Sequence, residues 1–288
     1  MTVAPALKRL ILGVLLLVLG AALFVATAIA IFPARLVEEW VKEAAAARTG
    51  LTIDSDPFHR SPPLGIGATR LAIRRGDAEL FTIDRLSVRL LPLSLLSGAA
   101  AAAVEGYAAG GAIGGTVSLR PGGLAADLAI SGLDLHAVGA ARAAGIELGG
   151  KADGAIDVSI GADGCPSGTV TLDIDGLDVK GLDIAGFALP LSDVESAGLR
   201  GFFEEGCRFV VEGLWLEQRD LSARVEGVVT IRRPYVDSPV SLTLELTPRG
   251  ALVENGGLAL LLGLYRKSAN FYSIPIGGTI GRPVVGGR

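Results

Sequence analysis

The chain has 288 residues, of which 50% are hydrophobic and 5% aromatic, with a formal net charge of −4 at pH 7. The acidic balance, with a pI near 5.3, excludes the basic surface of a nucleic-acid-binding protein. The apolar content is too high for a disordered chain, and the 40 glycines fit short strands and tight turns. The composition therefore predicts an ordered protein, in one large domain or two small ones, with no nucleic-acid partner.

An uncharged segment lies near the N-terminus, where residues 10–32 form a run of 23 without charge or proline. As a helix this run would be roughly 34 Å long, enough to cross a hydrocarbon core of about 30 Å. Lys8 and Arg9 precede it, and the positive-inside rule then places residues 1–9 in the cytoplasm and the rest of the chain across the membrane. The sequence predicts a single transmembrane helix over residues 10–32.

The alternative for this segment is a cleaved signal peptide, since residues 26–30 contain small-x-small patterns. The apolar run is longer than the 7–15 residues typical of a signal peptide, which favours a retained anchor. Whether the segment is retained or cleaved stays open at this point.

A second helix is predicted within residues 33–50. Pro33 ends the span, and apolar residues then recur at helical spacing opposite a charged face. Gly50 is a favourable C-terminal stop. We expect an amphipathic helix that lies beside the membrane.

From Leu51 onward the hydrophobic period changes to two, as expected for antiparallel strands with one apolar face and one wet face. The clearest alternating segments are 70–74, 81–90, 156–160, 170–175, 221–232, 240–247 and 271–280. Helical interruptions are expected to be few and short, namely a turn over Pro92–Ser97, a helix over Leu135–Ala144 capped by Asp134, and a helix over Ala251–Tyr265. Residues 51–288 are therefore predicted to form a β-rich domain.

A short motif of Gly, Leu, Asp and an aliphatic residue recurs at uneven spacing. The copies are Gly132-Leu133-Asp134-Leu135, Gly176-Leu177-Asp178-Val179 and Gly181-Leu182-Asp183-Ile184, with a looser one in Gly213-Leu214-Trp215-Leu216. The recurrence indicates an array of similar β units without a regular pitch.

An aliphatic face on so many strands has to be covered, and the chain has few amphipathic helices for that purpose. Either the sheet folds on itself as a sandwich, or it curls into an open groove that binds acyl chains or a partner protein. The groove would be lined by alternating apolar residues, which are Val170, Leu172, Ile174, Leu242, Leu244 and Leu246.

The chain has two cysteines, Cys165 and Cys207, both in turn-like sequences. In an oxidising compartment an isolated pair of this kind can be joined as a disulfide, and two separate thiols are the alternative. Two cysteines and two distant histidines lack the spacing of metal ligands, so no metal site is expected.

No catalytic set is recognisable in the sequence. His59 and His136 have no nucleophile or acid beside them, and Gly65-Ile66-Gly67 lacks the third glycine of a dinucleotide-binding loop. The sequence predicts a protein that is not an enzyme and needs no cofactor. A periplasmic hydrolase is the remaining alternative, and it would require His59 or His136 for activity.

The order of parts resembles the type II secretion system protein N family. The stretches that carry the resemblance are Phe32-Pro33-Ala34, Ile83-Asp84-Arg85-Leu86-Ser87-Val88, Leu90-Leu91-Pro92-Leu93, Gly110-Gly111-Ala112-Ile113-Gly114-Gly115 and Ile276-Gly277-Gly278-Thr279-Ile280-Gly281-Arg282-Pro283. The same pattern is similar to the wider AsmA-like group of anchored periplasmic β-domains.

The resemblance implies an accessory protein of type II secretion in the bacterial inner membrane, with the bulk of the chain in the periplasm and secretion-system proteins as partners. The AsmA-like alternative implies a lipid-binding or lipid-transfer protein that acts in outer-membrane biogenesis, with phospholipid as its partner. The expected fold is mainly β, with an N-terminal transmembrane helix followed by a curved, repeat-like antiparallel sheet, as a groove or a sandwich.

Overall fold

The computed structural model describes most of the chain after residue 50. The described residues are 51–61, 64–143, 145–181, 183, 184, 187, 188, 191, 194–232, 235–250, 253 and 262–286, with 38, 39, 42, 43 and 46 before them. The predicted span over residues 10–32 lies outside the described residues. Among the described residues, no helix has the length and apolar character needed to cross a membrane. Glu38 and Lys42, within the predicted second helix, are helical and joined by a hydrogen bond of 2.6 Å.

The described part of the chain is mainly β, and 16 of its strands form a single antiparallel sheet. The strands are β1 (Thr52–Asp54), β2 (His59–Ser61), β3 (Gly65–Arg75), β4 (Ala78–Leu91), β5 (Ala100–Ala108), β6 (Gly111–Arg120), β7 (Gly123–Asp134), β8 (Glu147–Gly161), β9 (Pro166–Lys180), β12 (Ser196–Glu204), β13 (Arg208–Glu217), β14 (Leu221–Thr230), β15 (Val240–Pro248), β16 (Arg266–Ser268), β17 (Phe271–Thr279) and β18 (Arg282–Val285). A separate two-stranded sheet pairs β10 (Asp183–Ile184) with β11 (Phe187–Ala188).

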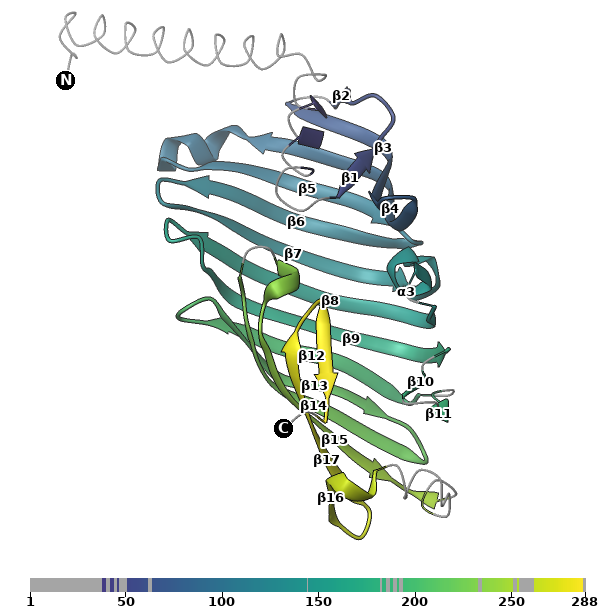
Figure 1. The fold of residues 1–288 in the computed structure, drawn as a ribbon. Helices are drawn as coiled ribbons and strands as arrows, with labels where there is room; N and C mark the ends of the chain where they lie inside the picture. The colour runs from purple at the N-terminus through teal and green to yellow at the C-terminus, as the bar shows by residue number, and fades with distance from the viewer. Residues whose placement is uncertain are drawn as a thin grey trace, which may run out of the picture.

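Strand order in the large sheet follows chain order. From β3 to β9 each strand pairs with the next one along the chain, and β12, β13, β14, β15 and β17 continue the series. β1 and β2 both pair with β3, while β16 and β18 both pair with β17, so these short strands lie at the two edges. The sheet is strongly twisted, since β5–β8 run across the view in Figure 1 whereas β17 runs steeply through it.

Helical segments are few and short. They are the 3-10 turns η1 (Pro92–Ser97), η2 (Leu135–Ala137), η3 (Tyr235–Asp237) and η5 (Gly263–Tyr265), and the helix α3 (Gly139–Ala143). The turn predicted over Pro92–Ser97 is confirmed. The single helix predicted over Leu135–Ala144 is instead divided into η2 and α3, and Asp134 caps η2 by accepting a hydrogen bond from the backbone N–H of His136. Val138 between them is extended, which interrupts the helical hydrogen bonding.

The recurring glycine–leucine motif marks β-bulges in the structure. The register shifts next to Gly132 in β7, next to Gly176 in β9 and next to Gly213 in β13. Gly132 and Gly176 both have a φ of 62°, the left-handed conformation that the first residue of a glycine bulge requires. Each bulge inserts one extra residue, bends its strand and increases the local twist. Three of the four copies therefore mark bends in strands of the large sheet, whereas Gly181 follows the end of β9.

A buried core lies at one end of the C-terminal half of the sheet. Its members come from the strands β9, β12, β14, β15 and β17 and from the segments that follow β9 and β15; they are Leu177, Val179, Leu191, Val194, Ala197, Leu221, Leu246, Leu262, Tyr272 and Ile274. Leu191, Val194 and Leu262 lie outside the named strands, and Leu191 pairs with Val179 of β9 through an isolated β-bridge. At about 25 cal/mol per Å² of buried apolar surface, this cluster supplies a large share of the local stability.

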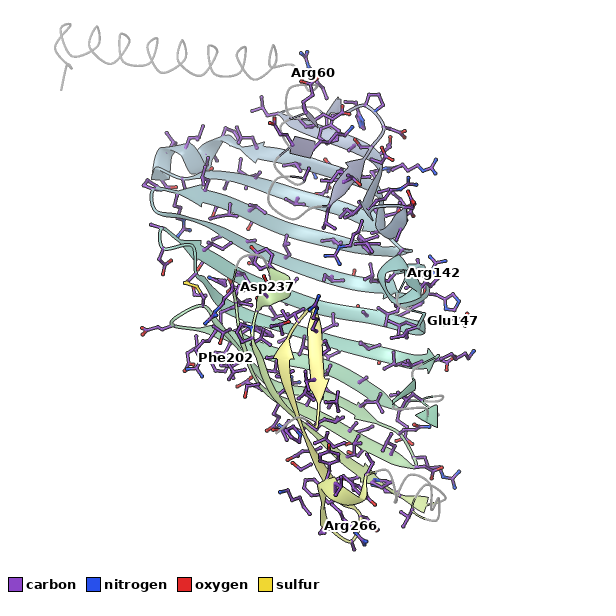
Figure 2. The ribbon with its side chains drawn as sticks, in the orientation of Figure 1. Arg60, Arg142, Glu147, Phe202, Asp237 and Arg266 are labelled. Atoms are coloured by element: carbon purple, nitrogen blue, oxygen red, sulfur yellow. A yellow bond between two sulfur atoms is a disulfide. The ribbon has the colours of Figure 1, made fainter. Side chains whose placement is uncertain are left out.

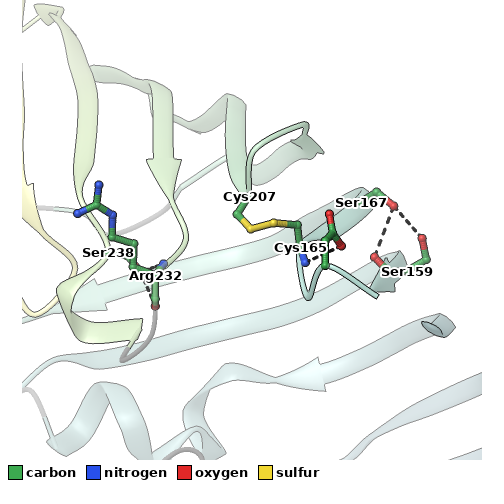
Figure 3. The surroundings of a disulfide bond; sticks show 7 residues. Ser159, Cys165, Ser167, Cys207, Arg232 and Ser238 are labelled. Carbon is green, nitrogen blue, oxygen red and sulfur yellow. Dashed lines mark hydrogen bonds between the residues drawn. A yellow bond between two sulfur atoms is a disulfide. The ribbon is translucent and has the colours of Figure 1, made fainter. Parts of the chain in front are cut away.

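A disulfide lies at the opposite end of the same strands. Cys165, in the turn between β8 and β9, is bonded to Cys207, in the turn between β12 and β13, with the two Cα atoms 4.8 Å apart (Figure 3). Cys207 has a φ of 59°, so the turn places a side chain other than glycine in the left-handed region. Nearby, the buried Ser238 hydroxyl accepts a hydrogen bond from the backbone N–H of Arg232 at 3.0 Å, which fixes the loop after β14 (Figure 3).

Candidate functional site

One face of the large sheet is apolar from β3 to β17, and Arg60 and Arg266 on the edge strands pair onto it. Residues that pair directly across antiparallel strands point to the same face, so the register identifies the members of each face. A representative row crosses the sheet through Val88, Val104, Gly115, Leu128, Ile156, Val170, Gly201, Val211, Gly227, Leu242 and Ile276. Between β4 and β15, the described paired positions on this face carry no charged side chain. Figure 2 shows that side chains extend from both faces of the sheet.

The apolar face is covered unevenly. At the core end Leu246, Tyr272 and Ile274 are at most 6% exposed, and they belong to one buried cluster with Leu191, Val194 and Leu262. In the N-terminal half Ala68, Leu71, Ala108 and Ala152 of the same face are buried. Most of its other side chains there are only half-buried, and Leu119 and Leu124 are 60% and 40% exposed. Apolar side chains of this size are normally buried, so an uncharged and only partly covered face of this extent is a candidate binding surface.

Glycines on this face allow close approach between strands. A Cβ at Gly115 would overlap the carbonyl oxygen of Asp127, and a Cβ at Gly168 would overlap that of Asp157. Both positions have a positive φ, 156° and 123°, which a larger residue rarely adopts.

The six residues predicted to line a groove all lie on the apolar face, but they divide between its two regions. Leu246 is in the core, and Ile174 and Leu244 pack against that core. Val170, Leu172 and Leu242 lie further toward the disulfide end and are half-buried. Residues of β4–β8, above all Leu119, Leu124, Leu128 and Ile156, belong to the same face and were missed as groove residues. Their period-two pattern could have identified them, because it matches that of β9 and β15.

The opposite face is polar and contains a recess over β12–β14. Its volume is about 480 Å³, and it is lined by Arg200, Glu212, Gly213, Trp215 and Arg224. The Arg200 guanidinium lies 5.3 Å from the centre of the Trp215 ring, within range of a cation–π contact. Gly198 makes room for the indole, because a Cβ there would collide with it. The bulge beside Gly213 opens the floor of the recess.

The two histidines do not meet. His59 lies in β2 at one edge of the sheet and His136 in η2 beside β8, and both are exposed. Within the described part of the chain, no group of three or more His, Cys, Asp or Glu side chains could hold a metal ion. A hydrogen bond from the Thr82 hydroxyl, with a smaller contribution from Arg74, holds the pKa of the exposed Glu79 carboxyl below its ordinary value. Glu79 is part of a surface ion pair and not of a cleft.

The fold and its faces define an open antiparallel sheet with one apolar and one polar surface. No protein-family model matches the chain, and no curated protein or solved structure matches it either. The functional argument therefore rests on the geometry of the two faces.

Proposed function

We propose that the protein is a lipid-binding module that holds acyl chains against the apolar face of its sheet. The observation that carries the proposal is an uncharged aliphatic face that runs from β4 to β15 and is only half-buried over its N-terminal half. An apolar ligand gains free energy there in proportion to the surface it covers, at about 25 cal/mol per Å². No charged group on that part of the face would have to be desolvated.

The dimensions of the open part suit a lipid. β4–β9 are neighbours at spacings of about 4.8 Å, so the face extends roughly 24 Å across these strands. In a bilayer one leaflet of acyl chains occupies about 15 Å, half of the hydrocarbon core. An acyl chain laid across the strands would therefore fit within the open part. We propose that this surface acts as a groove and not as half of a sandwich. The bulges beside Gly132 in β7 and Gly176 in β9 support this proposal, because a bulge bends its strand.

The test is the lipid content of the full chain purified in mild detergent, measured by mass spectrometry. We expect phospholipid to accompany the wild-type protein and to be lost from a Leu172→Glu variant, which adds a charge to the apolar face. Thr171→Glu is the matched control, because it adds the same charge one residue away on the polar face and should retain the lipid. Lipid-free wild-type protein, or equal loss from both variants, would contradict the proposal.

The proposed setting is the periplasmic side of a bacterial inner membrane, with residues 10–32 as a retained anchor. This part of the proposal is supported by the uncharged run and by Lys8 and Arg9 before it. A reporter enzyme that works only outside the cytoplasm, fused after Arg288, should be active. Activity of a cytoplasm-only reporter at the same position would reject this topology.

The polar-face recess favours a second candidate, the accessory role in type II secretion that the sequence resemblance implies. A partly exposed tryptophan flanked by Arg200 and Arg224 is typical of an energetic centre in a protein–protein interface. If a secretion-system protein docks there, Trp215→Ala should lower export of a secreted enzyme and remove cross-links to the partner. Tyr107→Ala is the control, since Tyr107 is an aromatic residue 55% exposed on the same face. Normal export from the Trp215 variant would reject this role for the recess.

A further inference from the structure

The turn η1 projects the most exposed leucines of the N-terminal half from one end of the sheet. Leu93 and Leu96 are 79% and 86% exposed, and Leu95 is 44% exposed. η1 lies between β4 and β5, at the left end of these strands in Figure 1. Exposed leucines on a protein surface are normally isolated from one another, so three within one turn indicate an interaction site.

The tip around η1 carries no charge. The 15 residues from Leu90 to Val104 include no Asp, Glu, Lys or Arg. The charged residues that flank this stretch, Arg89 and Glu105, form an ion pair with each other. Insertion of the tip into an apolar medium would therefore require no desolvation of an unpaired charge.

The polar groups of η1 are bonded within the turn. The Ser94 hydroxyl donates to the carbonyl of Leu91 at 2.6 Å, and the Ser97 hydroxyl donates to the carbonyl of Ser94 at 2.7 Å. The backbone N–H of Ala101 donates to the Ser94 hydroxyl at 2.9 Å, and the N–H groups of Gly98 and Ala99 close the turn on Leu95 and Ser94. In a low-dielectric environment there is no water to accept or donate hydrogen bonds, so polar groups of a polypeptide have to be hydrogen-bonded within the protein, as these are.

The tip is continuous with the apolar face. Beside η1, Ala100 pairs with Leu119, and Leu119 pairs with Leu124, on the uncharged face of the sheet. Leu119 and Leu124 are the most exposed members of that face in this half. η1 therefore lies at the same end of the strands as the most exposed part of the surface that the proposed function assigns to acyl chains.

We infer that η1 docks on a phospholipid bilayer, with Leu93 and Leu96 inserted at the boundary between headgroups and acyl chains, and that lipid enters the apolar face there. A protein partner would need directional hydrogen-bond groups, about one per 100–200 Å² of interface, and the serines of η1 direct theirs inward. Shallow insertion of leucines into the interface needs only apolar area. The lipid-entry part of the inference rests on the proposed function, whereas bilayer docking does not.

An environment-sensitive probe on the full chain tests the docking. Because Cys165 and Cys207 are joined to each other, Leu96→Cys introduces a single reactive thiol for a nitrobenzoxadiazole label. In vesicles of phosphatidylethanolamine and phosphatidylglycerol, we expect a blue-shifted emission that spin-labelled lipid quenches. Leu264→Cys is the matched control, since Leu264 is 92% exposed beyond the opposite end of the strands and should give an unquenched, water-like emission. A probe at residue 96 that behaves like the probe at residue 264 would overturn the docking.

A second measurement separates this inference from the proposed function. The full chain in nanodiscs is mixed with vesicles that contain a self-quenched fluorescent phospholipid, and uptake is followed as a gain in fluorescence. Leu93→Glu with Leu96→Glu should abolish uptake, because the charged side chains can no longer insert into the bilayer. Uptake at the wild-type rate by this variant would overturn the entry role of η1. Absence of bound lipid in the wild-type protein would instead reject the proposed function, and the quenching result would still decide the docking.

Discussion

The apolar face has two regions built from the same kinds of residue, and they differ in what covers them. At the core end, Leu246 and Ile274 are buried in one cluster with Leu191, Val194 and Leu262, which come from outside the named strands. Across β5–β8 the side chains have the same alternation and the same aliphatic character. Apart from Ala108 and Ala152, which are buried, most of them are half-buried or exposed. Alternation thus indicates which face is apolar, whereas the connecting segments decide whether that face is core or binding surface.

The disulfide and the core connect β9 to β12 at opposite ends of these strands. Removal of the disulfide should lower the free energy of unfolding more than any other change proposed below. The Cys165–Cys207 bond closes a loop with a sequence separation of 42. In the chain-entropy model such a crosslink contributes about 4 kcal/mol, so Cys165→Ser with Cys207→Ser should lower the free energy of unfolding by up to that amount. Urea denaturation followed by circular dichroism measures the change. On a gel, reduction should shift the mobility of the wild-type protein but not of Cys165→Ser.

Truncation within the core should have the next largest effect. Leu246 is 6% exposed, and Leu246→Ala should lower the free energy of unfolding by about 3 kcal/mol, because it removes apolar contacts and leaves a cavity. Thermal or urea denaturation measures the loss. A change below 1 kcal/mol would mean that the segments after β9 and β15 do not cover this end in solution.

The same truncation in the open region should lower the free energy of unfolding less, but it should weaken lipid binding. Leu172 lies on the same face and is half-buried, so Leu172→Ala should lower the free energy of unfolding by only about 1 kcal/mol. Added phospholipid should raise the melting temperature of the wild-type protein by mass action, and it should raise that of Leu172→Ala less. If Leu172→Ala and Leu246→Ala lowered the free energy of unfolding equally, the two regions would not differ in how well they are buried.

The smallest change in the free energy of unfolding is expected for a substitution at the margin of the open region. Leu124 is 40% exposed, and Leu124→Ser should change the free energy of unfolding by no more than about 0.5 kcal/mol. Lipid binding by the same variant should weaken, because a hydroxyl replaces apolar contact area on the proposed surface. Denaturation and lipid mass spectrometry on one preparation compare the two effects.

Much of the fold could be predicted from the sequence, because each strand has its own period-two pattern. The alternating segments in β3, β4, β8, β9, β14, β15 and β17 are strands in the structure. The bulges could not be predicted, since a single extra residue at Gly132 or Gly176 leaves the local composition unchanged and only the pairing reveals it. The recurring Gly-Leu pair can be recognised in the sequence, but the sequence does not show that the pair marks a β-bulge.

The candidate site was harder to predict than the fold. Val170 and Leu172 were placed correctly on the apolar face, yet Leu246 has the same pattern and is part of the core. The difference comes with Leu191, Val194 and Leu262, which belong to no alternating segment. Leu191 and Val194 join the core through backbone hydrogen bonds with β9 that the sequence does not reveal. The recess beside Trp215 depends on Arg200 and Arg224 from neighbouring strands, and their register with Trp215 cannot be read from one strand alone.

Strand order that follows chain order has a consequence for how the protein is made. From β3 to β9, each new strand finds its partner in the hairpin completed just before it, so the sheet can grow in step with the arrival of the chain. The core and Cys207 both require segments from the last third of the sequence. Until those segments are made, the growing sheet has an apolar face but neither the core cluster nor the disulfide. At that stage a chaperone or a membrane surface would bind to this face.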